Sequence, residues 1–203
     1  TPKLVDAFIK LHPDLDIKFF QFPKNLGDRA ACNYMVAKAT GDYFMCLSAD
    51  DTIEPNFMEK CVPIFQKNAQ LEFVASQSDF INVAGEKHTE FHPAKDIEKA
   101  KNKTQDEWKG RLYYGNVYFG AGMFRLKTLQ DLGGWKAEYG CLSDYEMYLA
   151  MLVRGDIHII EENLTQTRIH ASNMSMNLDP VWLRETYAAI RKRYYPPRRK
   201  LLI

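Results

Sequence analysis

The clearest pattern in the chain is the segment Gly41-Asp42-Tyr43-Phe44-Met45-Cys46-Leu47-Ser48-Ala49-Asp50-Asp51. Its apolar run, 43–47, predicts a short strand buried on both faces, as expected for the central strand of a parallel sheet. Ligands of open α/β sheets bind at the carboxyl ends of strands, where Asp50 and Asp51 would lie. Two carboxylates there supply the oxygen ligands that a hard divalent cation prefers. The segment therefore predicts a cation or ligand site at its end.

A second interpretation of these aspartates needs no ligand. Aspartate is common at helix starts, because its carboxylate accepts hydrogen bonds from the first backbone N–H groups. Asp51 and Thr52 would then only begin the helix that Pro55 predicts, since proline is favoured in a first helical turn. Taken alone, these residues leave both interpretations open.

Helices and strands alternate on both sides of this segment. The predicted helices are 4–11, 28–40, 55–67, 105–114, 127–132, 143–154 and 180–195. The predicted strands are 17–22, 43–47, 72–76, 80–83, 121–126, 156–160 and 164–170. Such alternation is typical of an α/β fold with a mainly parallel sheet flanked by helices. Residues 86–103 are charged and weakly patterned, and we expect them to form an excursion from the sheet.

Composition narrows the class of protein. A chain of 203 residues fits one domain with a sizeable core. Its 27 basic and 26 acidic residues give a net charge of +1, so no nucleic-acid partner is expected. The four cysteines form no Cys-x-x-Cys pair, which argues against a zinc site and favours reduced thiols and a cytoplasmic location.

Several motifs occur in the order of a known family. Between Asn25 and Asp51 the chain contains Asn-x-Gly, Ala-x-Asn, Ala-x-Gly-Asp-Tyr, an apolar strand and Ser-x-Asp-Asp. This run resembles the family 2 glycosyltransferases, which have a GT-A fold with a nucleotide-binding sheet. Ser48 stands where the family usually has the first aspartate of its Asp-x-Asp motif. Asp50 matches the second aspartate, which in the family usually binds the metal.

Three further motifs follow in the expected order. Residues 132–135, Leu-Gly-Gly-Trp, resemble the family's Gly-Gly-[Phe/Trp] near the acceptor pocket. Residues 143–149 resemble its Glu-Asp-Tyr-x-Leu segment, and Arg168-Ile169-His170 with Ser175 resembles its Arg-x-His and following serine. We therefore expect a GT-A domain over 1–178, followed by an amphipathic helix and basic tail over 179–203.

The resemblance implies a reaction and its residues. A sugar would pass, with inversion, from a nucleoside diphosphate sugar to a saccharide or other hydroxyl acceptor, as in polysaccharide biosynthesis. Asp50 and His170 would hold Mn²⁺ or Mg²⁺, and Asp144 would act as the general base. The residues expected on the donor side are Asn25, Gly27, Arg29, Asp50 and Arg168. Those expected on the acceptor side are Gly133, Gly134, Trp135 and Asp144.

Several of these residues also have structural interpretations. Ser143 and Glu146 have the spacing of a capping box, and Asp144 would lie in a first helical turn, where the helix dipole favours a carboxylate. A rigid helix start can also carry a catalytic base, so the two roles are compatible. Asn33 either lines the nucleotide side or packs its helix.

The histidines also have alternatives to metal binding. His170 could be an ordinary strand histidine, although Arg168, two residues earlier, would share its strand face. His88 and His92, with Glu86 and Glu90, have a possible ligand spacing, but we expect a solvated loop there.

The start of the chain departs from the family pattern. The family opens with a strand, a turn, a helix and a second strand that ends in an acidic segment recognising the base. Thr1 stands where that segment would end, so we expect an N-terminally incomplete sheet with exposed edges. The chain would then be a fragment, have a disordered start, or be completed by another polypeptide.

Two rival functions remain on the sequence alone. One is a non-catalytic module of the same fold that binds nucleotide sugars or serves assembly, which Ser48 and the missing front end both favour. The other is a nucleotidyltransferase, which needs a glycine-rich basic phosphate loop.

The C-terminal helix has alternatives of its own. The apolar residues of this helix are Trp182, Leu183, Tyr187 and Ile190, and the basic tail runs from Arg191-Lys192-Arg193 through Arg198-Arg199-Lys200. Together they could touch an anionic membrane surface at the inner face of the membrane. The alternative is a solvated terminal helix that contacts no membrane.

Overall fold

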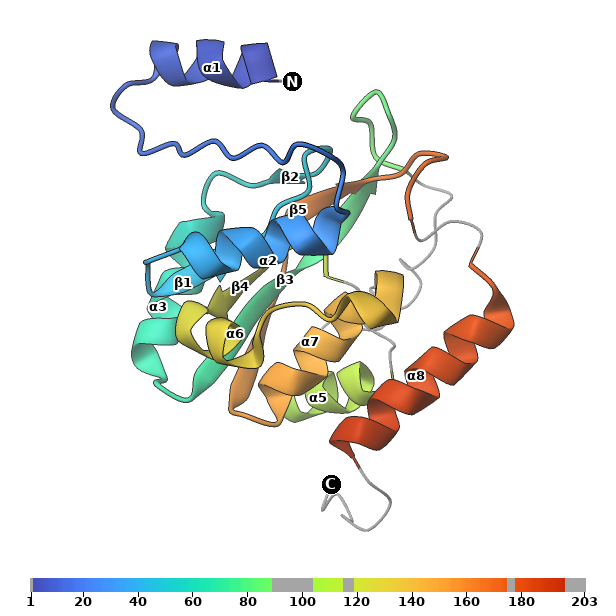
Figure 1. Ribbon diagram of the computed structural model, residues 1–203. Coiled ribbons are helices and arrows are strands. Elements are labelled where there is room, and N and C mark those ends of the chain that lie inside the picture. Colours follow the sequence, from blue (N-terminus) through green and yellow to red (C-terminus); the bar gives the residue numbers. More distant parts are fainter. Residues whose placement is uncertain (1, 89–103, 115–118, 175–177, 196–203) are drawn as a thin grey trace.

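The computed structural model describes residues 2–88, 104–114, 119–174 and 178–195 (Figure 1). In this part of the chain five strands form one sheet, in the order β1-β4-β3-β5-β2. The strands are β1 (Tyr43–Met45), β2 (Thr52–Ile53), β3 (Leu71–Ile81), β4 (Gly122–Arg125) and β5 (Asp156–Arg168).

Strand directions in this sheet are mixed. Strands β3 and β5 run parallel, from Leu71 beside Asp156 to Ile81 beside Arg168. Strand β4 is antiparallel to both of its neighbours, β1 and β3, and β2 is antiparallel to β5. The predicted α/β class is confirmed, but the expectation of a mainly parallel sheet with a central strand at 43–47 is wrong. A continuous apolar run indicates burial on both faces and carries no information about the direction of the neighbouring strand.

Other strand predictions need correction. Strands predicted at 72–76 and 80–83 are one strand, β3, and those at 156–160 and 164–170 are one strand, β5. Register shifts between Ser76 and Ser78 let the paired strands continue through the irregular segment. Residues 17–22 are extended, but they pair with no described strand. High β-propensity does not supply the neighbouring strand that a sheet requires.

The predicted helices are all present, with ends within two residues of the prediction. They are α1 (Pro2–Leu11), α2 (Asp28–Lys38), α3 (Phe57–Lys67), α5 (Gln105–Tyr113), α6 (Leu126–Leu132), α7 (Ser143–Leu152) and α8 (Pro180–Tyr194). A 3-10 helix, η1 (Ala137–Leu142), precedes α7 and was not predicted.

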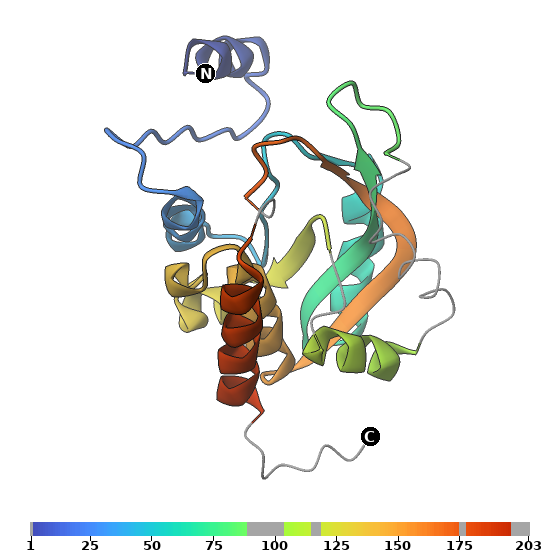
Figure 2. The same cartoon turned by 90° about the vertical axis from the view of Figure 1, so that its right-hand side faces the viewer.

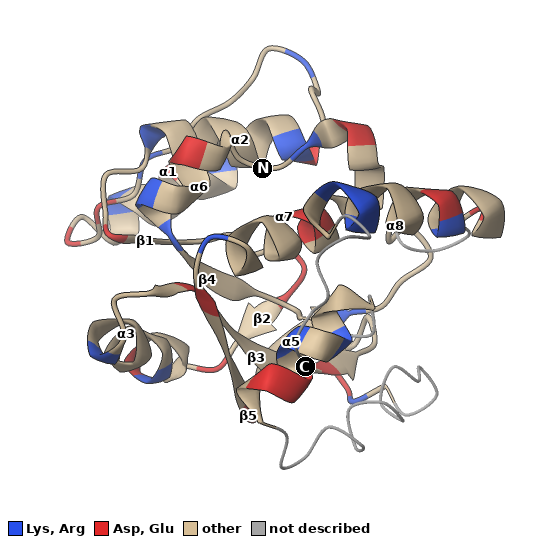
Figure 3. Ribbon diagram, turned by 90° about the horizontal axis from the view of Figure 1, so that it is seen from below, with Lys and Arg blue, Asp and Glu red and all other residues tan. Residues whose placement is uncertain are grey.

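The sheet separates two apolar cores. Neighbouring residues of one strand point to opposite faces, so Phe124 packs into the core beneath α2, α6 and α7, whereas Met123 packs against α3. Phe73 and Val74 divide in the same way on β3. Figure 3 shows α6 and α7 on one side of the sheet and α3 on the other.

Helix α8 is part of the larger core. Ile190 is fully buried, and Trp182, Leu183 and Tyr187 pack against the same cluster of buried residues. Figure 2 shows α8 lying along α7. The apolar side chains that could have faced a membrane therefore pack against the core of the protein. No helix within the described ranges is long and apolar enough to span a bilayer.

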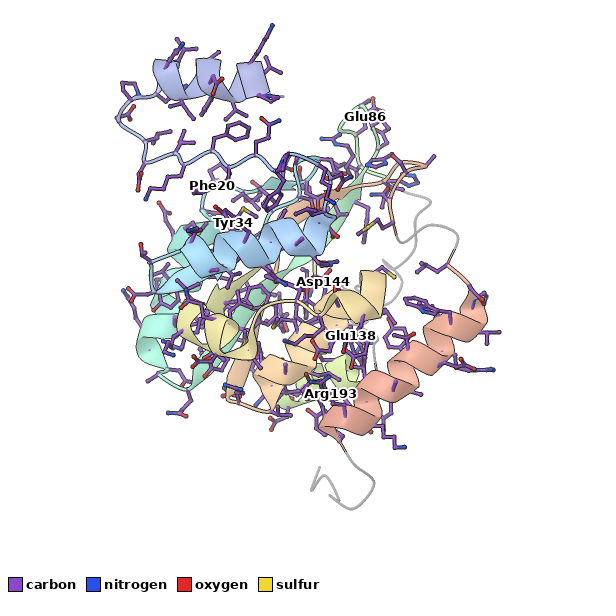
Figure 4. All side chains as sticks on the ribbon, viewed as in Figure 1. Phe20, Tyr34, Glu86, Glu138, Asp144 and Arg193 are labelled. Atoms are coloured by element: carbon purple, nitrogen blue, oxygen red, sulfur yellow. The ribbon has the colours of Figure 1, made fainter. Side chains whose placement is uncertain are left out.

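The N-terminal region is packed differently. Helix α1 buries none of its residues, and Leu4, Phe8 and Leu11 are exposed. The extended chain after it is attached through Phe20 and Phe22, whose rings each lie 5.3 Å from the Tyr34 ring on α2 (Figure 4).

Candidate active site

The first cluster of predicted site residues lies where the turn after β1 meets the end of β5. The Oδ2 atom of Asp50 lies 2.8 Å from Nε2 of His170, although 120 residues separate them in sequence. Both side chains reach solvent, with 40% of Asp50 and 26% of His170 exposed. The hydrogen bond with His170 is the main cause of a lowered pKa at Asp50. The structure therefore brings together the two residues predicted to hold a cation, and we call them the Asp50–His170 pair.

Arg168 fastens the turn that carries Asp50. Its backbone N–H donates to Oδ1 of Asp51 at 2.9 Å, and its Nε donates to the carbonyl oxygen of Asp50 at 2.9 Å. Its Nη1 donates to the carbonyl oxygen of Asn82 at 2.8 Å. The arginine that was predicted to face the donor therefore ties three chain segments together.

Asp51 does not serve the helix start suggested by the sequence. Helix α3 begins at Phe57, with Asn56 as the residue before it, and Thr52 belongs to strand β2. The Asp51 carboxylate instead accepts from the backbone of β5. Burial raises the pKa of Asp51, and the hydrogen bond from Arg168 acts in the opposite direction. Asp51 therefore connects its turn to the end of β5 and does not cap α3.

A tight turn after β5 orients His170. The backbone N–H of Asn173 donates to the carbonyl oxygen of His170 at 3.1 Å, and Oδ1 of Asn173 accepts from the His170 N–H at 2.6 Å. The Oγ atom of Ser172 lies 2.9 Å from Nδ1 of the imidazole. Neither Ser172 nor Asn173 was predicted to matter. Their signal is that of turn formers directly after a strand.

The second cluster surrounds Asp144 at the start of α7, which Figure 4 shows between α2 and α7. Arg29 donates through Nη1 to Oδ1 at 3.0 Å and through Nη2 to Oδ2 at 3.2 Å. The indole Nε1 of Trp135 donates to Oδ1 at 2.7 Å. Burial disfavours the charged form of Arg29, but the nearby Asp144 and Asp28 outweigh it and raise the pKa of Arg29.

Asn33 secures the Trp135 backbone from α2. Its Nδ2 donates to the carbonyl oxygen of Trp135 at 2.9 Å, and its Oδ1 accepts from the Trp135 N–H at 2.8 Å. Gly133 and Gly134 have φ angles of 73° and 70°, which favour glycine. A Cβ atom on Gly134 would overlap the Asn33 side chain. We call Arg29, Asn33, Trp135 and Asp144 the Asp144 cluster.

The predicted capping box is absent. The residue before α7 is Leu142, and no side chain caps the helix. Ser143 is fully buried, and Glu146 accepts a hydrogen bond from the Tyr194 hydroxyl instead. Because η1 leads directly into α7, the chain is already helical at Ser143 and no separate cap is required. Asp144 keeps its predicted place in the first turn.

The remaining predicted residues have local roles or lie outside the described ranges. Oδ1 of Asn25 accepts from the N–H of Gly27 at 2.8 Å, and Gly27, with φ of 87°, immediately precedes α2. Glu86 bonds to Asn82 at the tip after β3. Outside the described residues lie Glu90, His92, Ser175, most of the excursion at 86–103 and the end of the basic tail, 196–200. Among the residues that the structure describes, no group of three or more His, Cys, Asp or Glu side chains is arranged to hold a metal ion.

A family model described as Glycosyl transferase family 2 matches residues 1–130. The chain belongs to this family. No curated protein matches the chain at a significant level. The identification agrees with the motif resemblance in the sequence, and the matched range contains Asp50 as well as the α2 residues Arg29 and Asn33.

Solved structures similar to this family 2 chain include TarS 1–349 from S. aureus, with a TM-score of 0.62 at 13% identity. TarS 1–349 in complex with UDP-GlcNAc gives 0.65 at 13% identity. A mannosyltransferase, PcManGT from Pyrobaculum calidifontis, in complex with GDP-Man and Mn²⁺, gives 0.61 at 13% identity. The matches cover 93%, 93% and 95% of this chain and 51%, 53% and 56% of those chains. They confirm the predicted GT-A-type fold, and this chain spans about half the length of the structures it matches.

Proposed function

We propose that the protein transfers a sugar from a nucleoside diphosphate sugar to a hydroxyl acceptor, with inversion. Family membership supports the reaction class, and similar folds bind UDP-GlcNAc and GDP-Man. The observation that carries the proposal is the 2.8 Å approach of Asp50 and His170 from opposite ends of the domain sequence. Both residues lie at strand ends, and α/β folds bind ligands at the carboxyl ends of their strands.

The Asp50–His170 pair fits a divalent cation. A carboxylate oxygen and an imidazole nitrogen are both ligands for Mn²⁺, and Mg²⁺ is often held by one or two carboxylates together with substrate phosphates. Asp50 and His170 would therefore supply the protein ligands, and the donor diphosphate would supply further oxygens. A bound Mn²⁺ or Mg²⁺ supplies positive charge that stabilises the leaving diphosphate.

Asp144 is the proposed general base. An ionised carboxylate has about four acceptor positions. Three are used by the two Nη atoms of Arg29 and by Nε1 of Trp135, which leaves one position on Oδ2. That oxygen would accept the proton of the acceptor hydroxyl as its oxygen bonds to the anomeric carbon. The bond from that carbon to the diphosphate breaks and its electron pair leaves with the diphosphate, so a single displacement inverts the configuration.

A second candidate is a non-catalytic module that binds nucleotide sugars. The observation that favours it is Ser48, which offers a hydroxyl where the family usually has a carboxylate. Ser48 begins the turn that carries Asp50, since its carbonyl oxygen accepts from the N–H of Asp51 at 3.2 Å. This candidate predicts nucleotide binding without release of nucleoside diphosphate.

Membrane contact is a minor part of the proposal. Because Ile190 and its neighbours face the core, contact would depend on basic side chains rather than on insertion of the helix. Sedimentation with anionic and neutral vesicles tests it: equal binding to both would contradict an electrostatic contact.

The decisive experiment is a panel of nucleoside diphosphate sugars with Mn²⁺ and saccharide acceptors, followed by release of nucleoside diphosphate. We expect turnover with at least one donor, and a loss of about 10²- to 10⁴-fold in Asp144→Asn, the usual contribution of a general base. Asp106→Asn is a matched control, because Asp106 also lies in a first helical turn and its side chain is 92% exposed. Binding without turnover would favour the non-catalytic module, and unchanged turnover in Asp144→Asn would remove the proposed base.

A further inference from the structure

Arg29 lies against Asp144, although its position in the sequence suggested a donor ligand. We infer that Arg29 is a positioning residue for the base, and that Asn33 and Trp135 complete the support. The inference rests on the proposed role of Asp144. It assigns three side chains to holding one carboxylate oxygen in place for the acceptor hydroxyl.

The guanidinium of Arg29 forms a paired contact with the carboxylate of Asp144. Nη1 and Nη2 bond to different oxygens of Asp144, at 3.0 and 3.2 Å, and Nε lies 3.3 Å from Oδ2 of Asp28. The Arg29 side chain is only 14% exposed, whereas that of Asp144 is 44% exposed. A paired arginine–carboxylate contact fixes the plane of the carboxylate as well as its distance. The largely buried arginine therefore orients the carboxylate that reaches solvent.

Helix α2 carries both parts of the support. Arg29 and Asn33 are four residues apart, which places them on the same face of a helix. Arg29 holds the carboxylate directly, and Asn33 holds the backbone of Trp135, whose indole N–H donates to the same carboxylate. Gly134 lets this backbone approach Asn33, because any Cβ there would overlap the amide. One rigid helix thus aligns the base through two independent routes.

The kinetic test separates positioning from donor binding. In Arg29→Met we expect kcat to fall about 10- to 100-fold, the usual cost of misplacing a catalytic group, with the donor KM changed by less than about 2-fold, since ground-state binding is not removed. Arg29→Lys keeps the charge but lacks the planar fork of the guanidinium. Its kcat should therefore lie between that of the wild-type protein and that of Arg29→Met. Lys38→Met is the control, because Lys38 is an exposed cation on the same helix. A raised donor KM with unchanged kcat in Arg29→Met would overturn the inference.

The indole N–H of Trp135 gives a signal that does not depend on activity. Its NMR resonance should shift in Asp144→Asn and in Arg29→Met, and the resonances of the other two tryptophans should stay in place. Reduced turnover in Asp144→Asn, together with wild-type kcat and a wild-type indole resonance in folded Arg29→Met, would leave the proposed function standing and overturn this inference alone. Unchanged turnover in Asp144→Asn would remove the base and the inference with it.

Discussion

Asp50 and Asp144 are both partly exposed carboxylates, and they are held in different ways. Asp50 has a fixed backbone, because Arg168 bonds to its carbonyl oxygen, while its Oδ2 bonds only to His170 among the described contacts. Asp144 has a fixed carboxylate, because Arg29 and Trp135 occupy both of its oxygens. The Asp50–His170 pair can therefore exchange one hydrogen bond for a shared ligand, whereas the Asp144 cluster is already oriented before any ligand arrives.

The difference suits the two proposed roles. A cation arriving with a diphosphate needs ligand atoms that can separate and turn toward it, so weak mutual bonding is an advantage. A general base needs an oxygen held at hydrogen-bond distance from one hydroxyl, so several strong bonds are an advantage. Substitutions in the pair should therefore change binding, and substitutions in the cluster should change the chemical step.

The largest expected contrast is between Asp144→Asn and Asp50→Asn. Asp144→Asn should lower kcat about 10²- to 10⁴-fold, as expected for loss of a general base, with the donor KM near the wild-type value. Asp50→Asn should chiefly raise the donor KM and the Mn²⁺ concentration needed for half-maximal rate. Steady-state kinetics over a range of donor and Mn²⁺ concentrations measures both. Equal effects of the two variants on kcat and KM would break the comparison.

Gly134→Ala tests how the cluster is built. The new Cβ overlaps Asn33, and φ of 70° strains any side chain at this position. We expect a loss of roughly 1–3 kcal/mol in the free energy of unfolding, the range for a strained backbone position. Urea unfolding measures the loss.

The matched control for that substitution is Gly110→Ala. Gly110 lies inside α5, and apart from its chain neighbours and the backbone of its own helix, no atom lies within 4 Å of the added Cβ. Alanine in a helix interior is favoured over glycine by roughly 0.5–1 kcal/mol. A loss of stability in Gly110→Ala equal to that in Gly134→Ala would contradict the role of the Asn33 contact.

Ser172→Ala tests how the pair is oriented. Loss of the Oγ contact leaves Nδ1 of His170 without the hydrogen-bond partner that holds the orientation of the ring. Loss of such a supporting contact typically costs 10- to 100-fold in metal affinity, and we expect about 10-fold because Ser172 is exposed. Titration with Mn²⁺ followed by electron paramagnetic resonance measures the affinity. Ser172→Thr, which keeps the hydroxyl, should restore it, and failure to do so would contradict this role.

The sequence predicted local features and the approach of one distant pair. Helical periodicity located the helices, because apolar residues on one face of a helix recur at a characteristic spacing. The family motifs predicted that Asp50 and His170 lie close together, because the order of the motifs carries information about the fold that residue spacing alone does not.

Contacts between distant side chains were not predictable from local pattern. Arg29 and Asp144 are 115 residues apart, and nothing near either residue indicates the other. Ser143 and Glu146 have the spacing of a capping box, but η1 removes the need for a cap. Residues 17–22 have strand propensity, and the absence of a paired strand in the described part of the chain overrides it. In each case tertiary neighbours decided an outcome that local preference left open.

Ligation of Mn²⁺ by His170 is the most direct test of the account. Pulsed electron paramagnetic resonance of Mn²⁺ bound with a nucleoside diphosphate detects nitrogen atoms coordinated to the metal. We expect a coupling from one imidazole nitrogen in the wild-type protein and its loss in His170→Gln, although four other histidines remain in the chain. Bound Mn²⁺ without nitrogen coupling in the wild type, or with the same coupling in His170→Gln, would contradict the proposed site.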